Sequence, residues 1–441
     1  MLDTLAISVL LFLIGVSISV SLSYFRKRLS AYNELCRIRS SLTRLVLENQ
    51  RINSLYPPKY VTGDLRKLCQ DFPTRGDKCV DWMSLTDDYL SVVKSRLADR
   101  IEWAAGRNPK LADALKYTME KSGKMVRCRL IFLLGNLLSP GNKNVSLTDL
   151  AQVIELEHAA SLLHDDVVDD SDVRRGIASH RKKFGDRNAV LTGDNLISVL
   201  VEILTTDLDI NITRLVANSI ESLVIGELLQ LVSGVSTDAN SSTTTLIEDE
   251  ILPREFQSGT NDKNAARIKM YLKKSYFKTA SLFSCLGQCV AVITNQKQSD
   301  NLGLFCFYFG VAFQLVDDML DLTFLESSDN AAGKPVGGSD IRNGTVTLPI
   351  LFACIDDENL TENERIELVE MVDRKFASAT DFRKTIELVS KSNGMEKSRK
   401  LIATYFGYCR YLLRARIAPH QTTQYADAIE QLLLEFESRR K

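Results

Sequence analysis

LLHDDVVD, at residues 162–169, places three aspartates directly after an apolar leucine pair. In a helix, Asp165 and Asp169 are four residues apart and share one face, and Asp166 lies beside that face. Like charges with this spacing repel each other by roughly 0.2–0.5 kcal/mol per exposed pair. A hard cation such as Mg²⁺ selects carboxylate oxygens together with phosphates, and it would remove the repulsion. The stretch therefore predicts a magnesium site on an apolar helix.

The same arrangement occurs once more, as FQLVDDMLD at residues 313–321. Asp317 and Asp321 are again four residues apart, and Asp318 lies beside them. One D-D-x-x-D stretch alone is more often a solvated or capped helix end than a metal site. Two such stretches on separate apolar helices reverse that interpretation, because two facing carboxylate clusters could hold several Mg²⁺ ions around one diphosphate.

The rest of the chain indicates an all-α fold. Apolar residues recur at helical spacing, as in the stripe formed by Leu90, Val93, Leu97 and Ile101. Strand-like alternation is scarce, and only 9 prolines occur in 441 residues. Hydrophobic residues make up 45% of the chain and charged residues 25%, which is an ordinary globular balance for one large domain or two smaller ones.

The composition argues against several kinds of partner and site. The formal net charge of -1 gives no general attraction to nucleic acid, so an anionic substrate would have to be held by local clusters. The 9 cysteines are odd in number and scattered, which indicates reduced thiols rather than a disulfide framework. The 4 histidines show no H-E-x-x-H spacing, so no zinc site is expected.

The N-terminal region differs from the rest of the chain. Residues 1–25 are predicted to form a hydrophobic anchor or targeting segment, since residues 5–22 are all apolar or small. The basic residues Arg26, Lys27 and Arg28 follow, and they would keep the body of a membrane-anchored protein on the cytosolic or matrix side. Asp3 stands where a secretory signal is basic, and residues 26–51 are rich in Arg and Ser, so organelle import is an equal alternative.

Composition also predicts the domain boundaries. Pro57, Pro58 and a Gly-, Pro- and Asp-containing run indicate a linker, so residues 26–81 are assigned to an N-terminal extension and residues 82–441 to the main domain. Residues 233–264 are polar, rich in Ser and Thr and without a helical period. That composition predicts a flexible insertion, to which we assign no chemistry.

Basic residues occur at positions suited to binding phosphate. Arg supplies planar bidentate donors and Lys supplies a compact charge. Any one of these residues alone is an ordinary surface cation, whereas the set meets the need to hold two diphosphates. The set is Lys124, Arg127, Arg174, Arg175, Lys278 and Lys334.

With these stretches the chain resembles the trans-polyprenyl diphosphate synthases, from about Trp82 to near the C-terminus. Several matching segments occur in the family's order, which makes the resemblance specific. They are HDDVVDDSDVRRG at 164–176, GD at 193–194, GELLQL at 226–231, KTASL at 278–282, FQLVDDMLD at 313–321, GKP at 333–335 and TLP at 347–349.

The resemblance implies the fold, the metal and the reaction. The fold would be an all-α, isoprenoid-synthase-type helical bundle with a central active-site cavity. The enzyme would be a prenyltransferase that condenses isopentenyl diphosphate with an allylic diphosphate such as farnesyl or geranylgeranyl diphosphate. The Mg²⁺ ligands implied are Asp165, Asp166, Asp169, Asp317, Asp318 and Asp321.

The resemblance also implies roles for other residues. Arg174, Lys278 and Lys334 would contact the allylic diphosphate. Gln314 and the backbone near Thr279 would offer dipoles to a carbocation. The residues that would hold isopentenyl diphosphate are Lys124, Arg127, His158 and Arg175.

Product length follows from small residues before the first aspartate stretch. The growing chain would pass Ser161 and Ala160, which lie four and five residues before Asp165. Because short-chain members of the family block this path with aromatic side chains, a long-chain product is expected. Ordinary tight helix packing at small residues is the alternative.

Two departures from the family pattern bear on the type of enzyme. Residues 122–128 read SGKMVRC where the pattern is G-G-K-R-x-R-P, and Thr345 stands where many members have Lys. In this respect the chain is similar to the catalytic subunit of eukaryotic mitochondrial decaprenyl and solanesyl diphosphate synthases. That similarity implies a role in making the ubiquinone side chain, at the mitochondrial inner membrane or on its matrix side. Anchoring to another membrane, facing the cytosol, is the alternative location.

The oligomeric state and two other functions are also considered. A homodimer, or a heteromer with a second prenyl synthase subunit, is implied by the resemblance, and the N-terminal segment allows membrane association. A terpene cyclase would mix Asn, Ser and Glu in its second metal segment, which residues 317–321 do not. A non-catalytic or regulatory subunit should have lost acidic residues, and both stretches are intact.

Overall fold

The computed structural model describes residues 80–120, 123–140, 144–232, 263–296, 299–326, 338–355, 358–378, 380–419 and 423–439. The chain divides into two compact units, Met1–Leu55 and Tyr56–Lys441, and every described residue belongs to the second. The predicted anchor, nearly all of the predicted extension, residues 233–262 of the predicted insertion and Lys334 lie outside the described residues.

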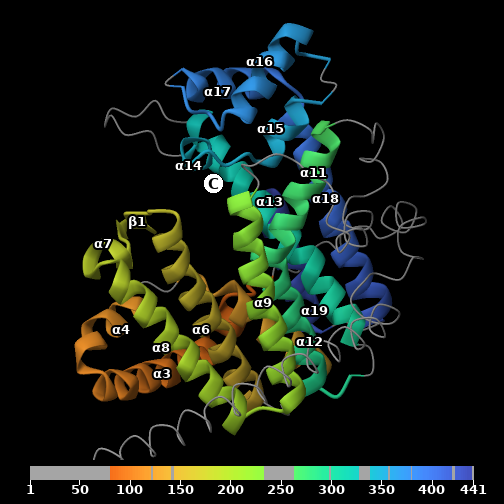
Figure 1. The fold of residues 1–441 in the computed structure, drawn as a ribbon. Coiled ribbons are helices and arrows are strands. Elements are labelled where there is room, and N and C mark those ends of the chain that lie inside the picture. The colour runs from red at the N-terminus through yellow and green to blue at the C-terminus, as the bar shows by residue number, and fades with distance from the viewer. Residues whose placement is uncertain are drawn as a thin grey trace, which may run out of the picture. The chain divides into compact units, whose positions relative to one another are not determined.

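The prediction of an all-α fold is confirmed, since one short hairpin is the only sheet in the described residues (Figure 1). The hairpin pairs β1 (Val173–Arg174) with β2 (Ile177–Ala178) in antiparallel register. The helices are α3 (Ser84–Arg107), η1 (Pro109–Leu111), α4 (Ala112–Met119), α5 (Val126–Leu138), α6 (Asn144–Val168), α7 (His180–Phe184), α8 (Asp186–Thr206), α9 (Ile210–Val232), α11 (Lys263–Ser275), η3 (Tyr276–Ala280), α12 (Ser281–Ile293), α13 (Ser299–Glu326), α14 (Ser339–Arg342), α15 (Leu348–Ala353), α16 (Glu362–Asp373), α17 (Asp381–Lys391), α18 (Gly394–Leu412), η4 (Leu413–Ile417) and α19 (Gln424–Ser438).

The helices form because their apolar residues recur every three or four positions. The predicted stripe Leu90, Val93, Leu97 and Ile101 is buried along α3, with at most 3% exposed. Burying one such side chain contributes roughly 1.5–3 kcal/mol. Caps fix where several helices begin: at α16, for example, Thr361 and Glu364 form a reciprocal capping box.

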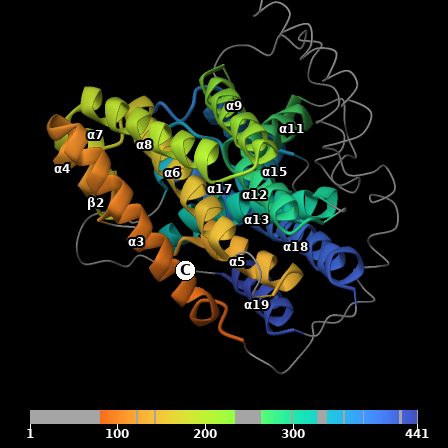
Figure 2. The ribbon, with the colours of Figure 1, turned by 90° about the horizontal axis from the view of Figure 1, so that it is seen from below.

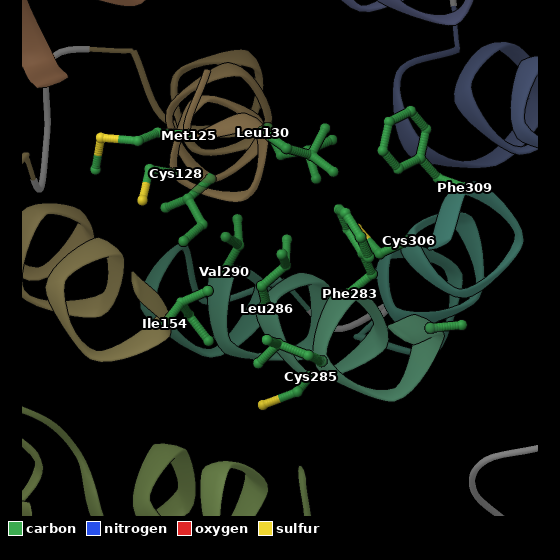
Figure 3. Close-up of a cluster of buried hydrophobic side chains, with 14 of the residues drawn as sticks. Met125, Cys128, Leu130, Ile154, Phe283, Cys285, Leu286, Val290, Cys306 and Phe309 are labelled. Carbon is green, nitrogen blue, oxygen red and sulfur yellow. The ribbon is translucent and has the colours of Figure 1, made fainter. Parts of the chain in front are cut away.

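Two helix pairs determine where the site lies. Helix α6 packs against α8, and α12 packs against α13, while α9 contacts α12. In Figure 2, α6 runs between α3 and the α12–α13 side of the bundle, and it contacts both α3 and α12. Figure 3 shows the core between α5 and α12, where Leu286 and Val290 point toward Leu130. The two aspartate stretches thus belong to helices anchored in one core.

A smaller apolar cluster covers the end of α13. It joins Leu322 to buried residues of α14, α15, α16 and α17, which are grouped together in Figure 1. The cluster holds α14 against α13, and so it places Asp340 beside the site described next.

Candidate active site

The first aspartate stretch lies at the C-terminal end of α6. The helix ends at Val168, so Asp165 and Asp166 are helical and Asp169 directly follows. The amide of Asp169 still donates a 2.8 Å hydrogen bond to the carbonyl of Asp165, which keeps the predicted four-residue spacing. The predicted common face of Asp165 and Asp169 is therefore retained at the helix end.

Asp166 is buried and paired with the first of the two arginines. It is 1% exposed, and its Oδ1 accepts hydrogen bonds from Arg174 Nε at 2.8 Å and Nη2 at 2.7 Å. Its Oδ2 is buried and has no hydrogen-bond partner within the described ranges. Arg175 and Gly176, both with positive φ, form the hairpin turn. Because of this turn Arg174 contacts Asp166, whereas the Arg175 guanidinium lies near Gly123.

Asp165 faces an ion pair contributed by two other helices. Lys278 Nζ lies 2.7 Å from Glu227 Oε1 of α9. Burial raises the pKa of Asp165 to about 7; Lys278 opposes the rise, and the nearby charges of Glu227 and Asp169 add to it. In these surroundings the charged form of the carboxyl group is disfavoured, and a bound cation would stabilise it.

Local backbone geometry brings Lys278 to this position. Residues Tyr276–Ala280 form a π-helical turn, a feature that often marks functional sites. A Cβ added at Gly226 would lie only 2.9 Å from the backbone nitrogen of Lys278, so only glycine allows α9 to approach this turn so closely.

The second stretch lies in the C-terminal half of α13 and forms a hydrogen-bonded chain. Tyr271 Oη donates to Asp318 Oδ2 at 2.5 Å, and Gln314 Nε2 donates to Asp318 Oδ1 at 2.7 Å. Gln314 Oε1 accepts from Thr279 Oγ1 at 2.6 Å. The predicted dipole residues Gln314 and Thr279 are thus linked directly to the acidic cluster.

Asp317 lies beside the C-terminal end of the chain. Burial raises its pKa to about 6, and Arg439, whose Nη1 is 3.3 Å from Asp317 Oδ1, opposes the rise. Nothing in the sequence around Arg439 signals a role, because the contact spans 122 positions. This partner of the site was therefore missed.

A fourth acid joins the second stretch from α14. The Asp340 amide donates to Asp321 Oδ2 at 3.0 Å. Burial, with the charges of Asp318 and Asp321, raises the pKa of Asp340 to about 8. The sequence analysis missed Asp340; its position shortly after the second stretch, behind two glycines, was the available signal.

Two lysines connect the acidic clusters. Lys278 acts electrostatically on Asp165, and Lys274, one helical turn earlier, acts with Asp318 and Asp340. Burial lowers the pKa of Lys274, and the acids around it oppose that change. Lys274 was not predicted, because a lysine next to another lysine is usually an exposed surface residue.

Two of the predicted isopentenyl diphosphate residues, Lys124 and Arg127, come from the loop before α5 and from α5 itself. A Cβ added at Gly123 would be 3.2 Å from the Arg175 guanidinium, so the loop that carries Lys124 meets the hairpin. Lys124 Nζ lies 3.6 Å from Glu435. The Arg127 guanidinium stacks 4.7 Å from the centroid of Phe283, and burial lowers its pKa.

His158 joins this basic set. Burial, followed by the charges of Arg127, Arg175 and Arg174, holds its pKa well below the ordinary value, so the ring is neutral at pH 7. A cleft beside it is lined by His158, Arg174, Arg175 and Asp166, among others. The cleft therefore brings together His158 and Arg175 of one predicted substrate set and Arg174 of the other.

The carboxylates fit a metal that is shared with a phosphate substrate. In the described part of the chain, no group of three or more His, Cys, Asp or Glu side chains forms a metal cage by itself. Mg²⁺ usually takes one or two carboxylates plus phosphate oxygens rather than an all-protein cage. The unpartnered Asp166 Oδ2 and the raised pKa values of Asp165 and Asp317 are consistent with such a shared ion.

Comparison with known proteins agrees with this geometry. The family model described as polyprenyl synthetase matches residues 108–389. A prenyl transferase of Synechocystis sp. is 32% identical over 70% of this chain and 84% of its own length. A mitochondrial solanesyl-diphosphate synthase of Oryza sativa is 31% identical over 75% of this chain and 72% of its own.

A solved structure extends the similarity to three dimensions. The polyprenyl synthase of Caulobacter crescentus, complexed with calcium and isoprenyl diphosphate, has a TM-score of 0.64 at 27% identity. It covers 83% of this chain and all (100%) of its own. The predicted isoprenoid-synthase-type bundle is confirmed, and the relatives are prenyl-transferring enzymes. The chain belongs to the polyprenyl synthetase family.

Proposed function

We propose that this protein is a magnesium-dependent, long-chain trans-polyprenyl diphosphate synthase. The observation that carries the proposal is the pair of aspartate clusters connected by Lys278 and Lys274 and flanked by the basic set around His158. One cluster with its lysine suits an allylic diphosphate, and the basic set suits a second diphosphate. Farnesyl or geranylgeranyl diphosphate is the proposed primer.

The chemistry follows from what these residues can do. Bound magnesium would neutralise the leaving diphosphate. Arg174, Lys278 and Lys334 orient that diphosphate while its allylic C–O bond breaks. The double bond of isopentenyl diphosphate then forms the new C–C bond, and the released diphosphate takes a proton from the adjacent carbon to restore a neutral alkene. Gln314 and the backbone near Thr279 would offer dipoles to the carbocation, and the apolar core would keep water away from it.

The proposed reaction is tested with the whole chain, Mg²⁺, labelled isopentenyl diphosphate and each primer, with products sized by chromatography. Long polyprenyl products that disappear with EDTA support the proposal. If no label is incorporated, either alone or with a candidate second prenyl synthase subunit, a binding or scaffold role is the better account. That outcome would leave the family assignment intact and overturn the proposed activity.

The cellular role is proposed from the relatives. The rice relative is named a mitochondrial solanesyl-diphosphate synthase. We propose that this protein likewise acts in mitochondria, at the inner membrane or on its matrix side, and supplies a ubiquinone side chain. The alternative is another membrane with the enzyme facing the cytosol. Microscopy of a tagged full-length chain separates the two locations.

Homodimer formation is proposed through α8. Its apolar residues Val190, Leu191 and Val201 are 39%, 43% and 46% exposed. Exposed apolar side chains on one helix can contribute to an interaction site. A second copy is the proposed partner, and a related subunit is the alternative.

Val201→Asp is expected to convert the dimer to a monomer, because it places a charge within an apolar interface. Light scattering during gel filtration measures the mass. Ile366→Asp is the matched control, since Ile366 is 51% exposed on α16, away from this face. A wild-type chain that is already monomeric, or a Val201→Asp dimer, would rule out α8 as the contact.

A further inference from the structure

One buried arginine outside the proposed substrate sets contacts the loop that carries Lys124. Arg129, near the start of α5, is 8% exposed, and its Nε donates a 2.9 Å hydrogen bond to the carbonyl of Lys124. The other nitrogens of its guanidinium reach the beginning of α3. Nη1 donates to the Met83 carbonyl at 2.6 Å and to Thr86 Oγ1 at 2.7 Å, and Nη2 donates to Asp87 Oδ1 at 2.8 Å. Arg129 therefore ties the Lys124 loop to α3.

The backbone between Lys124 and α5 has an unfavourable conformation. Met125, which directly precedes the helix, has φ 50° and ψ 45°, in the left-handed region that residues with a Cβ seldom adopt. Its side chain is buried in the core beside α5 (Figure 3). A strained residue of this kind persists only where the surrounding contacts fix it. The hydrogen bond from Arg129 to the preceding carbonyl is one of these contacts.

The side chain of Lys124 is held from the same direction as its backbone. Its Nζ lies 3.6 Å from Glu435 Oε1 of α19, and Glu435 Oε2 accepts a 2.8 Å hydrogen bond from the indole of Trp82. Trp82 is buried, and the Arg129 guanidinium lies 5.8 Å from the centroid of its ring. These contacts form a closed circuit, called the Lys124 clasp, of Arg129, Lys124, Glu435 and Trp82.

The two contacts that Lys124 makes in the clasp differ in strength. The side chains of Lys124 and Glu435 are 55% and 39% exposed, so their ion pair is weak and a phosphate can replace the carboxylate. The hydrogen bonds of Arg129 are charge-assisted and come from a buried side chain, so they are stronger. The clasp can therefore release the charge of the lysine to a ligand while it still holds the backbone.

We infer that Arg129 is a positioning residue for isopentenyl diphosphate, because it fixes the loop that presents Lys124 to this substrate. The inference rests on the proposed synthase function. Arg129 acts through the Lys124 backbone and not by touching the substrate. A displaced loop would also disturb the close approach of Gly123 to the Arg175 guanidinium, which belongs to the same substrate set. The proposed allylic diphosphate residues lie on other elements, so loss of Arg129 should weaken isopentenyl diphosphate binding selectively.

Arg129→Gln is expected to raise the KM for isopentenyl diphosphate about tenfold, the effect of losing one charge-assisted hydrogen bond. The KM for farnesyl diphosphate and kcat should stay unchanged. All three are measured from initial elongation rates with each substrate varied in turn. A wild-type KM for isopentenyl diphosphate in the variant, or an equal rise in both KM values, would overturn the inference.

Two further variants separate the loop contact from general stability. Asp87→Asn removes the ion pair of Arg129 but leaves the hydrogen bond to the Lys124 carbonyl, so both KM values should match the wild type. Arg100→Gln also loosens α3, because Arg100 donates hydrogen bonds to two side chains beyond that helix. Arg100 lies about 20 Å further along α3, so its loss should lower the melting temperature without changing either KM. A raised isopentenyl diphosphate KM in Arg100→Gln would leave Arg129 with only a structural role.

A second measurement depends neither on turnover nor on the folding of Arg129→Gln. Arg129→Lys keeps a charge beside Asp87, but a single ammonium cannot join α3 to the Lys124 carbonyl as the guanidinium fork does. Calorimetric titration with isopentenyl diphosphate alone should show about tenfold weaker binding than in the wild-type chain, with equal binding of farnesyl diphosphate. Equal affinities for isopentenyl diphosphate would overturn the inference. A wild-type chain that binds both diphosphates without elongation would overturn only the proposed function.

Discussion

Asp165→Asn is expected to lower the elongation rate by roughly 10²–10³-fold, the size of effect seen when one preorganised electrostatic group is removed from an active site. The substitution keeps the shape of the side chain but removes the charge that faces Lys278 and a shared magnesium ion. More Mg²⁺ should also be needed for half-maximal activity. Both quantities are measured by incorporation of labelled isopentenyl diphosphate over a Mg²⁺ titration.

The same variant should not be less stable above neutral pH. Burial raises the folded-state pKa of Asp165 from 3.8 to about 7. Because the folded state binds this proton more tightly than the unfolded state, the proton stabilises the fold. This contribution is fully present below about pH 4 and is lost as the pH rises through 7. At pH 8 the apo variant, with its neutral Asn, should therefore melt at the same or a higher temperature than the wild-type chain.

Asp99→Asn is the control for this pair of measurements. Asp99 is exposed on α3, and its removal should change neither elongation nor melting. Wild-type elongation by Asp165→Asn would contradict the metal role. A large drop in melting temperature would instead assign Asp165 a structural role.

The sequence predicted the fold well because the relevant signals are local. The stripe of Leu90, Val93, Leu97 and Ile101 depends only on residues within three helical turns, and it is buried as expected. The two aspartate stretches carry their own spacing, so their helical placement could also be predicted. What local spacing could not give was the π-helical turn at Tyr276–Ala280, because it depends on how α9 approaches at Gly226.

The missed parts of the site are long-range pairs. Lys274, Tyr271, Asp340 and Arg439 were not predicted from their own segments, and each meets an aspartate only after the helices pack. A single sequence contains no information about such pairs beyond residue type. Arg129 was missed for the same reason. From the sequence it resembles a surface cation, but it is buried where α5 packs on α3.

Arg174→Leu is expected to reduce both stability and activity, and the two effects can be separated. The guanidinium donates two hydrogen bonds to Oδ1 of Asp166, which is 1% exposed. Removing it leaves a buried carboxylate unpaired, which costs about 3–5 kcal/mol for a fully buried pair. Because Arg174 is 36% exposed, solvent screening reduces the expected loss in the free energy of unfolding to about 2 kcal/mol.

The double variant Asp166→Asn with Arg174→Leu separates the stability of the Asp166–Arg174 pair from the pair's effect on elongation. Asn carries no charge, so it removes the unpaired carboxylate and should restore most of the lost stability in chemical denaturation. It cannot replace a guanidinium that holds a diphosphate, and it also lacks the Oδ2 charge that a metal would use. The double variant should therefore fold like the wild-type chain and still elongate at least tenfold more slowly. Activity that returns together with stability would show that Arg174 serves only to neutralise Asp166.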